Sequence, residues 1–384
     1  MIIYHKLWLN NLRRLTLVEE DFGDGLVPES EWNAVQKACV HEFYSPNLFM
    51  RVGLFFLTIV SSLFSSGFLS LLVSSAMDSF GWPLFLGIAH YLALELLVRK
   101  NHHYRSGVDD ALLWISSGLF TTAFIMATNA DDNPLVLSLF IFLVSAVLSI
   151  RFSDSLMSLA WYCALLAVVF FGWQKIGPLG NATMPFVMML VSGISYWLVG
   201  KNVDNALFRF YSNNMIVIQV AALISLYAAG NYFIVKELND ILNGTVSKSI
   251  PFGWLFWGWT ITMPLIYIFF GVKQKNTILL RTGLLLIAAA AATYKAYYKL
   301  MPIEYTLIIC GALALLISYI ITRLLNPPKN GFTTKQLKKD YIMEELQLES
   351  LVISESFADA AIPVEEGFEF GGGEFGGGGS GGGY

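Results

Sequence analysis

The chain has 384 residues, of which 55% are hydrophobic, 15% aromatic and only 14% charged. A soluble protein does not need so many apolar residues to fill its core, whereas helices that face lipid do. The charges lie between long apolar runs and at the two ends of the chain. The net charge of −4 therefore averages unlike regions and says little about partners.

After residue 47, apolar runs long enough to cross a bilayer follow one another along the chain. Several are joined by short loops, which predicts antiparallel hairpins. We predict an all-α fold, a polytopic transmembrane helix bundle of about 10 spans. The predicted spans are Val52–Met77, Phe80–Val98, Asp109–Thr128, Leu135–Ile150, Asp154–Trp173, Thr183–Val199, Asn213–Val235, Pro251–Val272, Thr277–Thr293 and Ile303–Thr322.

Residues 1–47 have no long apolar run, so we expect no cleavable signal peptide. Apolar residues at helical spacing predict one helix over Tyr4–Leu17 and a second over Pro28–Phe43, with an acidic turn at Glu19–Gly25 between them. This short N-terminal helical segment is interpreted as a solubilising cap on the membrane domain. A module that binds a protein partner is the alternative.

The transmembrane domain is predicted over residues 48–325. The Asn-Pro-Pro sequence that follows directly ends the last span. Residues 326–353 follow, with an amphipathic helix at Thr333–Ile353 that suits a membrane surface. Residues 354–384 are acidic and Gly-rich and should be disordered, because such a composition cannot bury enough surface to fold. We expect this acidic tail to be a second region that recruits protein partners.

Orientation follows from the basic residues in the short loops. The richer set lies on the side of both termini, so both ends should be cytoplasmic. That set holds Arg51, Arg99, Lys100, Arg105, Arg151, Lys201, Arg209, Lys273, Lys275, Arg281 and Arg323, against Lys175, Lys236, Lys248, Lys295 and Lys299 on the other side.

The end of the chain, FEFGGGEFGGGGSGGGY, resembles the Gly-rich, aromatic-punctuated tails of some bacterial membrane proteins, including those that carry TPM domains. The order of a short N-terminal helical segment and then many spans is similar to a class of uncharacterised bacterial predicted membrane proteins. These resemblances imply a multi-pass protein of the bacterial inner membrane. They carry no functional residue onto this chain.

The stretch His90–Leu112 shows how one span ends and the next begins. Arg99 and Lys100 close the first span as interface anchors. Asp109 and Asp110 then open the following span, where acids favour the helix start as N-caps. Asp154 is placed in the same way before a later span.

Ionisable residues inside spans are the first places to look for function, because they are costly in lipid. His90 lies near the middle of its span. One interpretation is a proton relay or ligand contact, since histidine titrates near neutral pH. The other is a neutral imidazole bonded to a neighbouring helix, which we favour.

Three further residues are candidates for an intramembrane polar site. Glu95 lies one turn before Arg99, the favourable order for an ion pair on a helix, and should pair with it at the interface. Gln219 should face a partner helix or a cavity, with the helix favoured. Pro264 should kink or break the eighth span, either exposing backbone as transporters do or serving packing.

No phosphate loop, Ser/His/Asp arrangement or HExxH motif occurs, and the His102-His103 pair matches no metal spacing. We therefore expect no catalytic, cofactor or metal site and no nucleic-acid binding. Two functions stay open. The first is a non-enzymatic membrane scaffold that recruits partners. The alternative is a small-solute transporter or channel with a midplane site near His90 and a helix broken at Pro264.

Overall fold

The computed structural model describes residues 2–23, 25–73, 79–202, 205–244 and 250–297, together with a few positions between 308 and 323. All of these belong to one compact unit, residues 1–335. Their regular secondary structure is helical throughout, which confirms the predicted all-α fold.

Twelve α-helices occur in these described ranges, with short 3₁₀ turns at Ala130–Asp132 and Ala206–Tyr211. The helices are α1 (Lys6–Gly23), α2 (Glu29–Ala38), α3 (Leu48–Leu72), α4 (Gly81–Lys100), α5 (Val108–Thr128), α6 (Pro134–Phe152), α7 (Ser155–Gln174), α8 (Pro178–Asn202), α9 (Ser212–Gly230), α10 (Tyr232–Asn243), α11 (Gly253–Gln274) and α12 (Thr277–Tyr297).

Nine helices of the described part, α3 to α9 with α11 and α12, are long and apolar enough to cross a membrane. Many of their large apolar side chains are exposed, among them Phe56, Leu139 and Trp254. Each would cost about 1.5–3 kcal/mol in water relative to an apolar environment. The chain is therefore a multi-pass membrane protein, as the sequence predicts.

Part of the prediction cannot be compared with these helices. Most of the tenth predicted span, Ile303–Thr322, lies outside the described residues. So do residues 74–78 at the end of the first predicted span, and the regions 326–353 and 354–384.

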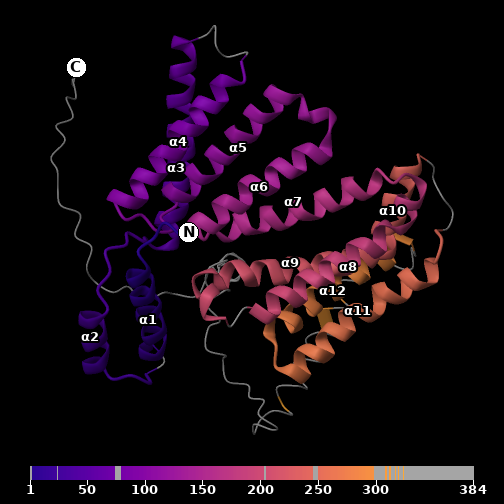
Figure 1. Cartoon of the computed structure of the whole chain (residues 1–384). Coiled ribbons are helices and arrows are strands. Elements are labelled where there is room, and N and C mark those ends of the chain that lie inside the picture. Colours follow the sequence, from indigo (N-terminus) through magenta and orange to yellow (C-terminus); the bar gives the residue numbers. More distant parts are fainter. Residues whose placement is uncertain are drawn as a thin grey trace, which may run out of the picture. The chain divides into compact units, whose positions relative to one another are not determined.

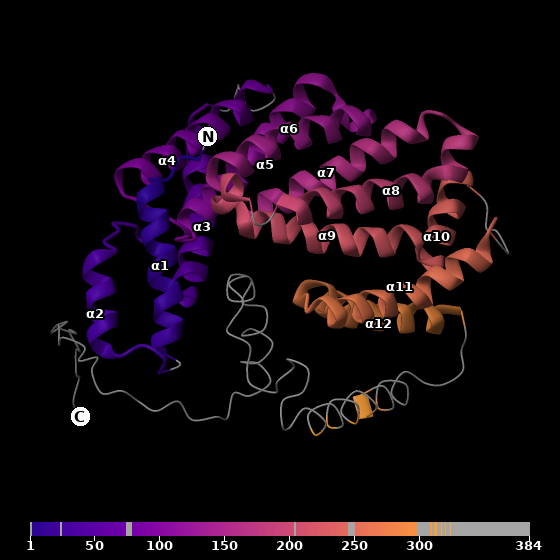
Figure 2. The ribbon, with the colours of Figure 1, turned by 60° about the horizontal axis from the view of Figure 1, so that its bottom comes forward.

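Consecutive membrane helices form hairpins. α4 packs against α5, α6 against α7, α8 against α9, and α11 against α12, and both views show these pairs side by side (Figures 1 and 2). The turn between α6 and α7 shows how the sequence sets such a hairpin. Ser153 adopts a left-handed conformation, and Asp154 then caps α7 by accepting the Met157 N–H at 2.6 Å.

The predicted span Asn213–Val235 is wrong at its end, because α9 stops at Gly230. Asn231 starts α10 instead, and its Oδ1 accepts the backbone N–H groups of Phe233 and Ile234. Its amide donates to the Tyr227 hydroxyl at 2.9 Å. An asparagine that caps one helix while bonding to the preceding one turns the chain at this point.

The N-terminal segment also differs from its prediction. α1 runs through the expected acidic turn at Glu19–Gly25 as far as Gly23, because the Phe22 ring stacks on Trp32 of α2 with 5.7 Å between ring centroids. α2 ends at Ala38 rather than Phe43. The residues after it are extended, and Tyr44 forms a single β-bridge with His103.

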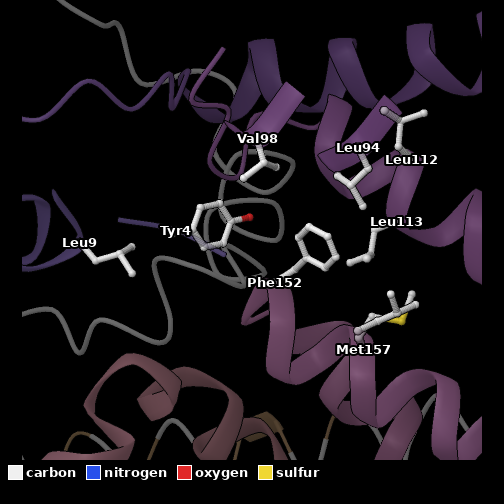
Figure 3. Close-up of a cluster of buried hydrophobic side chains, with 9 residues drawn as sticks. Tyr4, Leu9, Leu94, Val98, Leu112, Leu113, Phe152 and Met157 are labelled. Carbon is white, nitrogen blue, oxygen red and sulfur yellow. The ribbon is translucent and has the colours of Figure 1, made fainter. Parts of the chain in front are cut away.

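The main buried cluster joins the N-terminal segment to the membrane helices. Tyr4 and Leu9 pack with Leu94 of α4, Leu113 of α5 and Phe152 of α6, and Figure 3 shows the Tyr4 ring facing these side chains. This packing gives the N-terminal segment a defined place at one end of α4–α7.

Candidate functional site

Backbone hydrogen bonds, aromatic contacts and ion pairs gather at the junction between the N-terminal segment and the membrane helices. Backbone hydrogen bonds hold it: the Ile3 N–H donates to the Arg151 carbonyl at 2.9 Å, and the Tyr44 N–H donates to the His102 carbonyl at 3.0 Å. The Tyr104 N–H returns a bond to the Tyr44 carbonyl at 3.2 Å. The segment is thus attached by main-chain bonds on both sides of α1 and α2.

Aromatic rings reinforce this attachment. The Trp8 ring meets His102 edge-on with centroids 4.7 Å apart, and Tyr4 meets Tyr104 in the same way at 4.9 Å. Burial, followed by the Asp109 carboxylate, raises the pKa of the Tyr4 hydroxyl well above its usual value. Tyr4 therefore stays neutral at physiological pH.

Glu95 lies at the centre of an ion-pair network that adjoins this junction through Arg151. Its Oε2 is 3.1 Å from Arg99 Nε, as the sequence predicts. Its Oε1 pairs in addition with Arg151 of α6 and accepts the Tyr91 hydroxyl at 2.8 Å. A carboxylate with only 12% of its side chain exposed needs such partners. Glu95 thereby joins α4 to α6.

Asp109 and Asp110 lie in the first turn of α5, but neither is its N-cap, which is Gly107. That part of the prediction is wrong. The Asp109 carboxylate turns back and accepts the backbone N–H groups of Arg105 and Ser106, each at 2.8 Å. Asp110 instead pairs with Arg51 of α3. The two acids therefore fix the preceding loop and a third helix.

Ser106 connects Asp109 to His103. The Ser106 hydroxyl donates to Asp109 Oδ1 at 2.9 Å, and its oxygen is 2.7 Å from His103 Nδ1. Because the serine proton goes to the aspartate, the histidine must donate here and cannot act as the base that would activate the serine. Ser106 is also fully buried. This trio orders the loop and has no nucleophile that a substrate could reach.

A second polar cluster joins α6, α7 and α9. The Asn214 amide donates to the Ser158 hydroxyl at 2.6 Å and to the Asp154 carbonyl at 3.0 Å, and Ser158 bonds to Ser149 at 2.6 Å. Burial raises the pKa of the Asp154 carboxyl, while the Met157 N–H lowers it. The cluster contributes to the association of these helices.

His90 is half-buried, and its ring bonds within its own helix. The Nδ1–H donates to the Leu86 carbonyl, one turn earlier in α4, at 2.8 Å. The partner on a neighbouring helix that we expected is not found among the described residues. The carbonyl oxygen has two lone pairs and accepts the side-chain donor alongside its helix bond. His90 can therefore satisfy one ring nitrogen without a second helix.

The helix that contains Pro264 is not broken. α11 continues through this residue to Gln274, so the expected interruption is wrong. Pro264 is fully buried, and its carbonyl lies 3.1 Å from the position of a Cβ on Gly283 of α12. A Cβ on Gly271 would lie 2.6 Å from the Leu280 nitrogen. Pro264 therefore belongs to a surface where the backbones of α11 and α12 approach closely.

Gln219 of α9 is buried, with 7% of its surface exposed. Within the described residues its side chain has no hydrogen bond, but its Nε2 lies against α8, 3.1 Å from the position of a Cβ on Gly200, as expected for a contact with a partner helix. It also lines a groove of about 470 Å³ that α8, α9 and the start of α12 form. Trp197, Lys201 and Asn276 also line this groove. Gln219 thus packs against a partner helix and also faces a cavity, so both alternatives apply.

The structure brings Glu95 into a network but leaves His90, Gln219 and Pro264 in three separate places. Sequence reasoning missed Arg51 and Arg151 as partners of acids. A signal was present, because both belong to the basic set assigned to one side of the membrane together with Arg99. Among the described residues there is no group of three or more His, Cys, Asp or Glu placed to hold a metal ion.

Comparisons with protein-family models, with curated proteins and with solved structures found no match to this chain.

Proposed function

We propose that this membrane protein is a non-enzymatic scaffold whose N-terminal helices recruit a protein partner. The observation that carries the proposal is the way α2 is held. The segment is attached by Ile3, Tyr4 and Tyr44 on either side of the helices, whereas no residue of α2 itself is buried. A helix that is fixed by its flanks but does not contribute to the core leaves its surface available for binding.

The chemistry of α2 suits a polar partner surface. Glu29 and Glu31 lie in its first turn and Lys37 in its last. Asn33 and Gln36 lie between them and are exposed. Such a surface offers charged and hydrogen-bonding groups rather than an apolar face. It fits a soluble partner better than the membrane surface, which would require exposed apolar residues.

The small-solute transporter has less support. It rested on His90 as a midplane site and on a helix broken at Pro264. The His90 ring bonds to its own helix, and α11 continues through Pro264. Glu95 is engaged by two arginines at a helix end. None of these residues lines the groove of Gln219.

We place the protein in the bacterial inner membrane with both termini in the cytoplasm, on the basic bias of the loops. This agrees with the grouping of Arg51, Arg99 and Arg151 around acids of neighbouring helix ends. The N-terminal helices and the acidic residues 354–384 then face the same compartment. A cytoplasmic partner can reach both.

Photo-crosslinking in cells tests the scaffold. A crosslinking amino acid is placed at Glu31 or at Lys37, both exposed on α2. Each position should yield a discrete adduct with one protein after irradiation. The matched control is Leu139 of α6, which is 47% exposed on a membrane helix and should react with lipid only.

A charge change then separates specific contact from chance collision. The double substitution Glu29→Lys and Glu31→Lys reverses the charge of the first turn of α2. It should remove the adduct formed from Lys37 while expression stays unchanged. If neither α2 position gives a protein adduct, or if Leu139 gives the same one, the scaffold proposal is wrong.

A further inference from the structure

The groove beside Gln219 has the composition of a lipid-headgroup site, and the geometry points to an anionic phospholipid as its ligand. The groove opens between α8, α9 and the start of α12. Its volume of about 470 Å³ is large enough for a headgroup and its glycerol. Its residues play no part in the N-terminal junction or in the proposed partner surface.

Hydrogen-bond donors converge on the groove. Gln219 is 7% exposed, its amide has no hydrogen bond within the described chain, and the amide stays accessible from the groove that it lines. Asn276 uses its Oδ1 to accept the Ile278 and Leu279 N–H groups at the start of α12. Its Nδ2 donors therefore remain for a ligand, since no hydrogen bond to them is found in the described residues. Both amides suit the oxygens of a phosphodiester.

Charge complementarity selects an anion. Lys201 lines the groove, and its Nζ lies 5.5 Å above the Trp197 ring; no acid of the described part of the chain pairs with it. The helices α8, α9, α11 and α12 contain no Asp or Glu. They carry Lys273 and Arg281 near the same loop. A basic pocket between membrane helices at this depth is the type that binds acidic lipid headgroups.

The rim of the groove selects a lipid over a free anion. Trp197 is 61% exposed on a membrane helix, and Ile216 and Ile278 also line the groove. Apolar groups adjoining the donors suit the acyl chains of a bound lipid. An aromatic ring at this level is typical of the membrane interface. The headgroup would bind Gln219, Asn276 and Lys201, with its chains along Trp197.

Native mass spectrometry of the full chain in detergent tests this site. The protein is titrated with phosphatidylglycerol, with phosphatidylcholine and with inorganic phosphate. Phosphatidylglycerol should bind at one preferred site, at least tenfold more tightly than phosphatidylcholine. Lys201→Gln should weaken it about fivefold, the effect of one lysine near an anionic surface, and Gln219→Leu should weaken it further.

The controls make each outcome decisive. Lys175→Gln removes a lysine just before the start of α8, at the opposite end of that helix from Lys201, and should leave the affinity unchanged. Gln219→Leu loses no protein hydrogen bond, so its thermal midpoint without lipid should not fall. Equal binding of both lipids overturns the proposal, and so does an equal loss in Lys175→Gln and Lys201→Gln. Saturation of the site by phosphate alone would replace the lipid with a free anion.

Discussion

The Nη2 atom of Arg51 at the start of α3 lies 2.8 Å from Oδ2 of Asp110 on α5, and the Arg51 Nε donates to the same oxygen at 2.9 Å. α3 has almost none of its apolar stretch buried in the protein. Its strongest packing is against α5. This charged contact therefore has a large share in holding the first membrane helix to the rest of the domain.

Removing one partner of this pair should destabilise the protein. Asp110→Ala leaves the partly buried Arg51 charge without its acceptor, which should cost about 1–3 kcal/mol. Thermal unfolding in detergent, followed by tryptophan fluorescence, measures the loss. Asp132→Ala, in the exposed turn after α5, is the control and should change little. The single variants Arg51→Met and Asp110→Leu are measured beside their double variant, which should lose less than the two single losses added together; strict additivity would show that the pair does not interact.

Gly107 allows the loop to approach α3. Its φ is +87°, and a Cβ there would lie 2.0 Å from the Arg51 carbonyl oxygen. Gly107→Ala adds both a strained conformation and a collision with backbone. It should lower folded yield sharply or abolish it. Gly118→Ala, inside α5 with open space around it, should be neutral or slightly stabilising; equal behaviour of the two variants would refute this account.

Asp154 predicts a pH dependence of stability. Because burial raises its pKa in the folded protein, protonation favours folding. This contribution is fully present below the unfolded pKa of about 3.9 and is lost as the pH rises through the folded pKa. Asp154→Asn keeps an oxygen for the Met157 N–H and should be at least as stable as wild type at pH 7. Asp154→Ala loses the cap and should cost about 1 kcal/mol.

Thermal midpoints from pH 4 to pH 8 decide this prediction. The difference between Asp154→Asn and wild type should grow in favour of the variant as the pH rises. A variant that is less stable than wild type at pH 7 and equal to Asp154→Ala would mean that the charge itself is required.

His90 should be replaceable. Its ring bonds only to a carbonyl of its own helix among the described contacts, so His90→Gln and His90→Leu should each change stability by less than about 0.5 kcal/mol. Both should leave partner crosslinking from Lys37 intact between pH 5 and 8, where histidine titrates. A pH-dependent phenotype lost in both variants would restore His90 as a proton relay.

Reporter fusions test the orientation. Fusions at Arg105, Arg209 and Lys275 should report the cytoplasm, and fusions at Asp131 and Asn243 the opposite side. Asn243 is the most informative position, because it ends α10, the helix that follows the corrected end of α9. A cytoplasmic signal there would mean that the second half of the domain has the orientation opposite to the predicted one.

Much of the fold follows from local sequence. The apolar runs predicted nine helices that the described structure contains, since length and composition alone decide whether a helix can span a bilayer. The cap at Asp154 and the Glu95–Arg99 pair were also predictable, because their partners lie within one helical turn. The break at Asn231 was not, because the apolar pattern continues past it and part of the support for the turn is distant: the Asn231 amide also donates to Thr293 of α12, and the Tyr232 N–H donates to Thr260 of α11.

Tertiary packing decided the rest. Arg151 and Arg51 pair with acids that lie 56 and 59 residues away in the chain, and no local sequence pattern predicts such a pairing. Gly107 and Gly283 show their importance only when another backbone lies against them. That Gln219 lies against α8 and also opens onto a groove depends on how α8, α9 and α12 are spaced. Contacts of this kind depend on which helices become neighbours, and hydrophobicity along one chain does not encode that choice.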